Sequence, residues 1–334
     1  MKRRLELPAP LYRTGLGAAY VGDSLTLLKK LPDASVDLVV TSPPFPLKRP
    51  KEYGNLVGKE YEDWLASFAE EVLRVLKDSG SFVIDLGGTY LKGRPVRSLY
   101  NYRLLLRFVE GIGFRLAEEF FWFNPSKLPA PIEWVNKRKI RVKDSVNTVW
   151  WLSKTDFPKA DVRNVLTPYS KRMRKLLEDP ERYYREASRP SGHSISGGFG
   201  KKNAGAIPPN LLSIPNTESN STYITYCKAA GVKPHPARFP AKLPEFFIRF
   251  LTEPGDLVVD IFAGSNTTGW VADTLKRRWL SFELDHGYLS GSALRFFPPG
   301  ISRDRLEDAL AELLEDPGAQ VNLEKALYKN ATAK

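Results

Sequence analysis

A short polar and aromatic loop follows an apolar run near the N-terminus. Ser42, Pro43, Pro44 and Phe45 come directly after "VDLVVT" (36–41), which predicts a buried strand. The strand cannot continue through the prolines, because proline has no backbone N–H to donate. A serine hydroxyl and a proline-stiffened carbonyl can together grip an amine, and Phe45 offers a stacking face for an unstacked base. Taken alone, however, "SPP" is more typical of a strand end than of a site.

A second loop has the composition of a ligand-binding turn. "VVDIFAGSNTTG" (258–269) reads as a strand, a glycine-containing turn and a helix start, and small residues let backbone N–H groups approach a ligand. It lacks the lysine of a Walker loop and the GxGxxG spacing. The next predicted strand carries Glu283 about twenty residues on, where a carboxylate accepts hydrogen bonds from ribose hydroxyls. A tight turn beside a surface glutamate is the alternative, but the pair favours a nucleotide-like ligand.

The elements around these loops alternate between strand and helix, which predicts an α/β sheet. Both loops then leave strands at the same edge of that sheet, so we expect them to meet. Strands are predicted at 18–22, 36–41, 79–88, 114–124, 145–154, 256–262 and 279–285. Helices are predicted at 24–31, 61–77, 100–113, 243–251, 266–278, 288–297 and 303–316.

The charge of the chain points to a polyanionic partner. The 334 residues carry a net charge of +12, and they suit one large α/β domain with an insertion, or two domains. A basic but functionally neutral surface is the alternative, which the clustering of the charge disfavours. Five cations beside Trp134 are predicted to contact phosphates: Lys137, Arg138, Lys139, Arg141 and Lys143.

An irregular segment lies between the two halves of the predicted sheet. Residues 155–220 contain one basic helix and a Gly/Ser/Pro-rich stretch, which is too long for an ordinary connection. If the polyanionic partner is a nucleic acid, we expect this segment to read its base edges, with Arg189 and His193 as candidate contacts.

Other classes of protein and site are disfavoured. Cys227 is the only cysteine, so an intramolecular disulfide is impossible. His193, His235 and His286 lie far apart without metal-ligand spacing, so no metal site is predicted. No apolar run approaches the roughly 20 residues of a membrane-spanning helix, and the basic N-terminus lacks the core of a secretory signal. The expected location is the cytoplasm.

The two loops also carry a resemblance to a known family. "TSPPF" and "DIFAGSNTTG" resemble the catalytic and cofactor motifs of S-adenosylmethionine-dependent DNA amino-methyltransferases, in the motif order of the permuted class called beta. Residues 12 to 298 resemble the PvuII-type cytosine-N4 methyltransferases in particular. Further matching stretches are "YVGDSLTLL", "KEYGN", "FWFNPSKLP", "IEWVNKRKIRVKD", "NTVWW", "RPSGH", "IPPNLL" and "HPARFPAKLPEFFIR".

This resemblance implies roles for individual residues. Ser42, Pro43, Pro44 and Phe45 match the catalytic loop, and Asp85 matches a carboxylate that works with the serine. Asp85 could also be a plain turn carboxylate before two glycines. The implied S-adenosylmethionine site consists of Asp23, Thr41, His235, Pro236, Phe239, Asp260, Phe262, Gly264, Ser265, Asn266, Thr267, Thr268 and Glu283. Ala263 stands where the PvuII-type loop has glycine.

The resemblance also implies an architecture. It predicts a Rossmann-like, seven-stranded, mostly parallel sheet with an antiparallel hairpin, in circularly permuted order, plus an irregular target-recognition insertion. The catalytic half is expected at 12–154, the recognition region at 155–225, the cofactor half at 226–300 and a helical tail at 301–334.

The expected function is methylation of a flipped cytosine at N4 in duplex DNA. Family members that methylate adenine N6 usually carry Asp or Asn in place of Ser42, which favours cytosine. The expected setting is a restriction-modification system, with the endonuclease as a separate chain and this protein as a monomer or weak dimer. Adenine-N6 methylation, methylation of an RNA base or a protein glutamine, and DNA binding without catalysis remain as alternatives. The PvuII-type palindrome CAGCTG is the first site to test.

Overall fold

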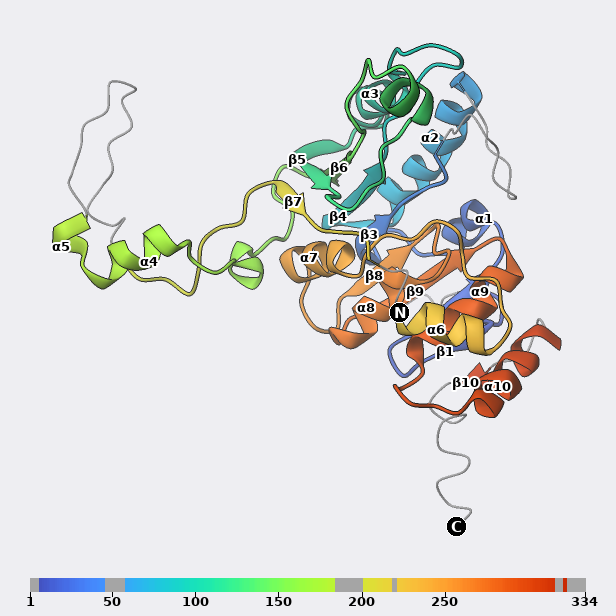
Figure 1. The fold of residues 1–334 in the computed structure, drawn as a ribbon. Coiled ribbons are helices and arrows are strands. Elements are labelled where there is room, and N and C mark those ends of the chain that lie inside the picture. Colours follow the sequence, from blue (N-terminus) through green and yellow to red (C-terminus); the bar gives the residue numbers. More distant parts are fainter. Residues whose placement is uncertain (1–5, 46–57, 184–200, 218–220, 316–320, 323–334) are drawn as a thin grey trace. The chain divides into compact units, whose positions relative to one another are not determined.

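The computed structural model describes residues 6–45, 58–183, 201–217, 221–315 and 321–322 (Figure 1). The chain forms two compact units, one of residues 1–159 with 210–334 and the other of residues 160–209. The smaller unit lies within the segment 155–220 that the sequence predicts to be irregular. None of the described helices is long and apolar enough to cross a membrane.

The larger unit is built on one mixed sheet, which has ten strands in the described chain, not the predicted seven. The difference comes from three short strands of two or three residues, β1, β7 and β10, which pair at the ends of the sheet. Such pieces are too short to show an alternating pattern in sequence. The strands are β1 (Tyr12–Arg13), β2 (Gly17–Val21), β3 (Val36–Thr41), β4 (Leu76–Leu86), β5 (Arg115–Phe123), β6 (Val146–Ser153), β7 (Leu211–Ser213), β8 (Leu257–Asp260), β9 (Arg278–Glu283) and β10 (Val321–Asn322).

The strand order places the two loops of interest side by side. The order is β10-β1-β2-β9-β8-β3-β4-β6-β5-β7, and all pairs from β2 to β4 are parallel. β6 runs antiparallel to both β4 and β5, so the predicted antiparallel pair is present. From β8 the chain continues to β9, whereas from β3 it continues to β4 on the other side. The crevice between two strands whose connections diverge in this way is the usual ligand site of an open α/β sheet.

Helices cover both faces of this sheet. They are α1 (Ser24–Lys29), α2 (Gly58–Val75), α3 (Tyr100–Leu106), α6 (Thr222–Ala229), α7 (Lys242–Leu251), α8 (Thr267–Thr274), α9 (His286–Ser292) and α10 (Arg303–Glu315). Short turns of other helix types are η1 (Arg107–Ile112), η2 (Glu133–Lys137) and η6 (Ala293–Phe296). The predicted helix 100–113 therefore changes from α to π geometry part-way along its length.

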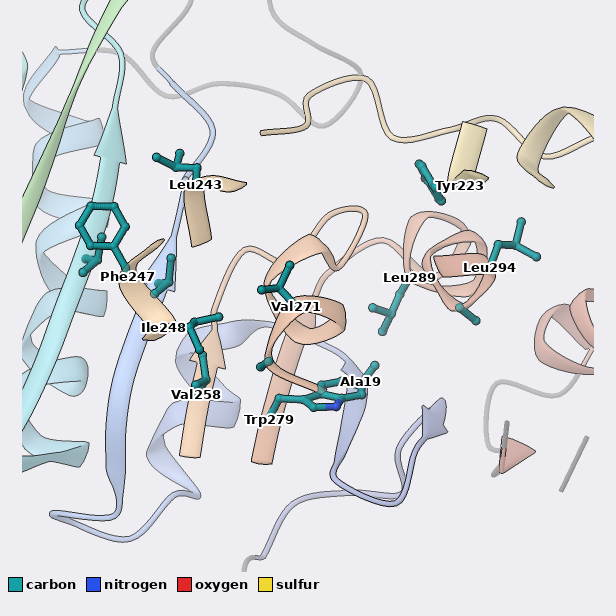
Figure 2. Close-up of a cluster of buried hydrophobic side chains, with 14 of the residues drawn as sticks. Ala19, Tyr223, Leu243, Phe247, Ile248, Val258, Val271, Trp279, Leu289 and Leu294 are labelled. Atoms are coloured by element: carbon teal, nitrogen blue, oxygen red, sulfur yellow. The ribbon is translucent and has the colours of Figure 1, made fainter. Parts of the chain in front are cut away.

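Two apolar cores follow from the alternation of side chains along the strands. In β9, Trp279 points to one core and Phe282 to the other. Figure 2 shows the first core, where Val258 and Trp279 face Ile248 of α7 and Val271 of α8. The second core packs α1, α2 and α3 against the opposite face. Both faces of the central strands are thus covered, which explains why β3 is buried along its whole length.

The smaller unit contains little regular structure. It holds η3 (Val162–Val165), the basic helix α4 (Lys171–Glu178) and α5 (Pro180–Tyr183). Ser170 begins α4 by accepting a hydrogen bond from the Met173 backbone N–H at 3.1 Å. Thr167 and Ala206 form an antiparallel bridge across the unit.

Candidate active site

A cavity of about 800 Å³ opens at the carboxyl edge of the sheet, where β3 and β8 lie next to each other. It is lined by residues from both of the loops that the sequence singles out. Of the predicted catalytic and cofactor-binding residues, those that line it are Asp23, Ser42, Pro43, Pro44, Phe45, Asp85, His235, Pro236, Phe239, Phe262, Gly264, Ser265, Thr267 and Glu283.

The pairing of β3 with β4 sets the geometry of the catalytic loop. Thr41 pairs with Ile84, so the next residues of the two strands, Ser42 and Asp85, come out beside each other. Ser42 Oγ donates a hydrogen bond to Asp85 Oδ2 at 3.1 Å. Phe45 packs close to the chain after β4, and a Cβ on Gly87 would come within 2.5 Å of its ring. Only glycine at that position lets the Phe45 ring lie where it does.

Asp85 is a buried carboxylate with a perturbed pKa. Burial raises its pKa from 3.8 to about 6. Hydrogen bonds from Asn147 and Ser42 and the positive charge of Lys127 act in the opposite direction. The side chain is therefore largely ionised at neutral pH, yet it is far more basic than an ordinary aspartate. This is the property expected of a group that accepts a proton.

The loop after β8 is held in a conformation that requires glycine. Gly264 has φ +51°, and its N–H donates to Glu283 Oε2 at 2.8 Å. A Cβ on Gly264 would lie 2.9 Å from His235 Cε1. Asn266 also has positive φ, which asparagine tolerates, and begins α8 by accepting from the Gly269 N–H at 3.1 Å. The two positive-φ positions of this loop thus differ in which residue type they need.

Four predicted cofactor residues lie beneath the cavity rather than among its lining residues: Thr41, Asp260, Asn266 and Thr268. Asp260 accepts hydrogen bonds from Thr41 Oγ1 and Thr268 Oγ1, both at 2.7 Å, and from the Phe262 N–H at 3.1 Å. Burial raises the pKa of Asp260, and these hydrogen bonds oppose that rise. These four side chains are thus placed to hold the loop in shape.

Two carboxylates predicted to bind the cofactor also line the cavity. Glu283 ends β9, and burial raises its pKa, while backbone N–H groups of Asp285 and Gly264 act against this. Asp23 is exposed and begins α1, with Oδ2 accepting from the Thr26 N–H at 2.9 Å. Asp23 therefore has a capping role in the fold as well as a place in the cavity wall.

Comparison with known proteins agrees with this geometry. A family model described as DNA methylase matches residues 36–294. The type II methyltransferase M.PvuII of Proteus hauseri is 59% identical over 313 residues, which cover 94% of this chain and 93% of that protein. The chain belongs to the DNA methylase family. A more distant relative, M.BglII of Bacillus subtilis, is 26% identical over 283 residues, covering 85% of this chain and 69% of that protein.

A solved structure leads to the same family, and a second one shares the fold. The PvuII DNA methyltransferase, described as cytosine-N4-specific, matches with a TM-score of 0.77 and 52% identity over 95% of this chain and 98% of that one. A DNA modification methylase from Thermus thermophilus, complexed with S-adenosyl-L-methionine, matches with a TM-score of 0.51 and 22% identity, covering 85% and 95%. The latter likeness concerns the fold alone.

The cavity of this DNA methylase fits the cofactor that such enzymes use, S-adenosylmethionine. Gly264 and Glu283 line the cavity together, and Glu283 supplies a carboxylate for hydroxyl groups. Trp64 and Phe262 form an aromatic wall, with ring centroids 5.4 Å apart. Tyr61 lines the same cavity, and its buried hydroxyl has no hydrogen-bond partner among the described residues. An unpaired buried donor of this kind fits a polar ligand.

Sequence reasoning missed several residues of the cavity. Lys127 and Asn147 line it beside Asp85, Asn124 lines it just after β5, and Tyr61 lines it from α2. The stretches "FWFNPSKLP" and "NTVWW" contain three of these residues, but nothing in their spacing shows that they meet in one cavity. The described part of the chain holds no cluster of side chains that could bind a metal ion, so no residue is assigned to one.

The basic segment lies outside the cavity lining. Lys137 and Arg138 are exposed and pair with Glu133 at 3.4 and 3.1 Å, and Arg138 also lies over the Trp134 ring. Arg141 and Lys143 are exposed and donate to backbone carbonyls, and Lys139 is exposed. Arg189 and His193, the candidate base-reading residues, lie outside the described residues.

Proposed function

We propose that this DNA methylase transfers a methyl group from S-adenosylmethionine to the exocyclic N4 of a cytosine turned out of duplex DNA. The observation that carries the proposal is the shared cavity: the Ser42–Asp85 pair and the Gly264–Glu283 pair line one space. The choice of cytosine rests on Ser42 and on the 59% identity to M.PvuII, whose structural counterpart is described as cytosine-N4-specific.

The N4 amine is a poor nucleophile, because its lone pair is delocalised into the ring. S-adenosylmethionine, when bound, supplies a methyl group already activated on a sulfonium, which is left as a neutral thioether. Ser42 Oγ and the Pro43 carbonyl accept hydrogen bonds from the two amine hydrogens, which localises the lone pair and spreads the developing positive charge. Phe45 supplies the stacking surface that holds the base in place.

Asp85 receives the proton that the amine must lose. The amine gives this proton to Ser42 Oγ as the serine hydroxyl proton moves to Asp85 Oδ2, along the 3.1 Å hydrogen bond. The carboxylate is ready for this role at neutral pH, since its pKa of about 6 keeps it largely ionised but basic.

DNA is held by two further parts of the chain. The exposed cations from Lys137 to Lys143 contact phosphates, which fix the register without reading sequence. The region 155–225 reads the base edges, and Arg189 and His193 are its candidate contacts. The functional division of the chain is then a catalytic half at 12–154, a cofactor half at 226–300 and a helical tail from 301 onward, in the permuted motif order.

The biological setting follows from the same likeness to type II methyltransferases. The protein protects the DNA of its cell as the modification enzyme of a restriction-modification system, and a DNA substrate implies work in the cytoplasm. The endonuclease is a separate chain. A monomer or weak dimer suffices, since each strand of a palindrome can be methylated in turn.

The test is methylation of mixed-sequence DNA followed by digestion to nucleosides and mass spectrometry. We expect 4-methylcytosine, and base-resolution mapping should find it within CAGCTG. If 6-methyladenine is the only product, the assignment of the acceptor base is wrong. If calorimetry detects no binding of S-adenosylmethionine, the protein is a DNA-binding module instead.

A further inference from the structure

A side chain on β6 holds the proposed proton acceptor from the side opposite Ser42. Asn147 Nδ2 donates hydrogen bonds to Asp85 Oδ1 at 3.0 Å and to Oδ2 at 3.4 Å. The strand register explains the contact. Val149 pairs directly with Asp85, so Asn147 lies two residues along on the same face of the sheet, at the diagonal position. Asn147 also lines the cavity, within reach of any group that approaches Asp85.

Among the polar groups around Asp85, only some donate a hydrogen bond directly to its carboxylate. Four polar groups face the carboxylate: Ser42 after β3, Asn147 on β6, Lys127 in the segment between β5 and β6, and Tyr100 on α3. The Tyr100 hydroxyl donates to the Gly87 carbonyl, so its proton is not available to Asp85. Lys127 contributes through its charge. Direct side-chain hydrogen bonds to Asp85 in the described chain thus come from Ser42 and Asn147.

These two donors differ in what happens to them during the reaction. The Ser42 hydroxyl surrenders its proton to Asp85 as its oxygen takes one from the amine, so its hydrogen bond to Asp85 changes in the reaction. The Asn147 amide has no proton to give up and stays a donor throughout. A buried carboxylate that loses its last fixed donor tends to take up a proton or turn away from its partner. Asn147 is therefore the donor whose hydrogen bond to Asp85 persists while the hydrogen bond between Ser42 and Asp85 changes.

We infer that Asn147 is a positioning residue for the methyl transfer, whose amide fixes the Asp85 carboxylate with Oδ2 directed at Ser42 while the proton moves. The inference rests on the proposed transfer to an amine and deepens it. Asn147 need not touch the cofactor to do this. Removal of the amide changes how readily Asp85 ionises, and it leaves the residues of the cofactor side unaltered.

The test is the pH dependence of kcat for DNA methylation by Asn147→Ala. Loss of a hydrogen bond to the ionised carboxylate favours its protonated form, so the acid limb of the profile should move upward by about one pH unit or more. Activity should recover in part at high pH, and the affinity for S-adenosylmethionine should stay within about twofold by calorimetry. Asn147→Asp keeps the size of the side chain and places a second carboxylate beside Asp85, so it should move the limb further.

Thr148→Val is the matched control. Thr148 is the next residue of β6, and its Oγ1 donates to the Leu86 carbonyl at 2.9 Å without contacting Asp85. Its profile should be that of the wild type. The inference is overturned if both Asn147 variants lose activity equally at every pH with an unmoved acid limb, which is the behaviour of a purely structural residue. Failure of the proposed function looks different, because the wild-type protein itself then makes no 4-methylcytosine.

Discussion

Replacement of Gly264 by alanine tests whether the loop after β8 forms the cofactor site. Gly264 has φ +51°, and an L-residue in this region of backbone space costs roughly 1–2 kcal/mol. The new Cβ would also lie 2.9 Å from His235 Cε1. The His235 ring cannot simply retreat, because it packs edge-on against Tyr288 with centroids 4.7 Å apart. The loop must therefore shift, and with it the Gly264 N–H that holds Glu283.

The strain alone corresponds to about a 5- to 30-fold change in an equilibrium constant, and the steric contact adds to it. We expect Gly264→Ala to bind S-adenosylmethionine at least about tenfold more weakly by calorimetry. Gly93→Ala is the matched control, since Gly93 has φ +70° but nothing within 4 Å of a new Cβ. It should lower thermal stability by a similar amount and leave the affinity unchanged. Wild-type affinity in a folded Gly264→Ala protein would refute the reasoning.

Three further predictions concern the other parts of the site. Ser42→Ala should lower kcat by about 10²- to 10⁴-fold, while the affinity for the cofactor, measured by calorimetry, stays unchanged. Near-normal turnover would mean that Ser42 does not pass the proton from the amine to Asp85. Asp85→Asn should abolish most activity yet raise the thermal stability at pH 7.5. Burial raises the pKa of Asp85 from 3.8 to about 6, so ionisation of Asp85 destabilises the folded protein as the pH rises through this range. This loss of stability, which the asparagine avoids, reaches up to roughly 3 kcal/mol. That advantage should vanish toward pH 4 in thermal melts, and an advantage independent of pH would contradict this origin. Joint replacement of Lys137, Arg138 and Lys139 by Gln should weaken binding to all duplexes alike and flatten its salt dependence; unchanged affinity at moderate salt would exclude a phosphate-binding role.

The sequence predicts the central strands well, because their burial on both faces leaves long apolar runs. The predicted strand 36–41 is β3 itself, and 279–285 contains most of β9. Helix α6 was missed, since "TYITYCKA" is rich in residues with low helix propensity. Tyr223, Ile224 and Cys227 are buried in the core, so tertiary packing holds a helix that local preference does not favour.

The residues of the site also divide into those that the sequence predicts and those that it misses. Ser42 and Gly264 could be found in the sequence because backbone chemistry marks them: prolines that stop a strand, and a turn that needs small residues. Asn147 and Lys127 could not, since their place beside Asp85 depends on the pairing of β6 with β4 and on the course of the segment after β5. Thr41 and Asp260 were predicted to bind the cofactor, whereas the structure places them under the cavity.

The position of Thr41 explains how two motifs more than 200 residues apart are brought into one geometry. Its backbone pairs with Ile84 of β4, which sets Ser42 beside Asp85, and its hydroxyl donates to Asp260 at the end of β8. β3 thus aligns Ser42 with Asp85 on one side and with the loop after β8 on the other. A slip of one residue in β3 would turn Ser42 to the opposite face and remove the Thr41 hydroxyl from Asp260. Leu38, Val39 and Val40 of β3 alternate between two filled cores, which makes such a slip costly. The packing of the sheet thus maintains the alignment of the two halves of the site.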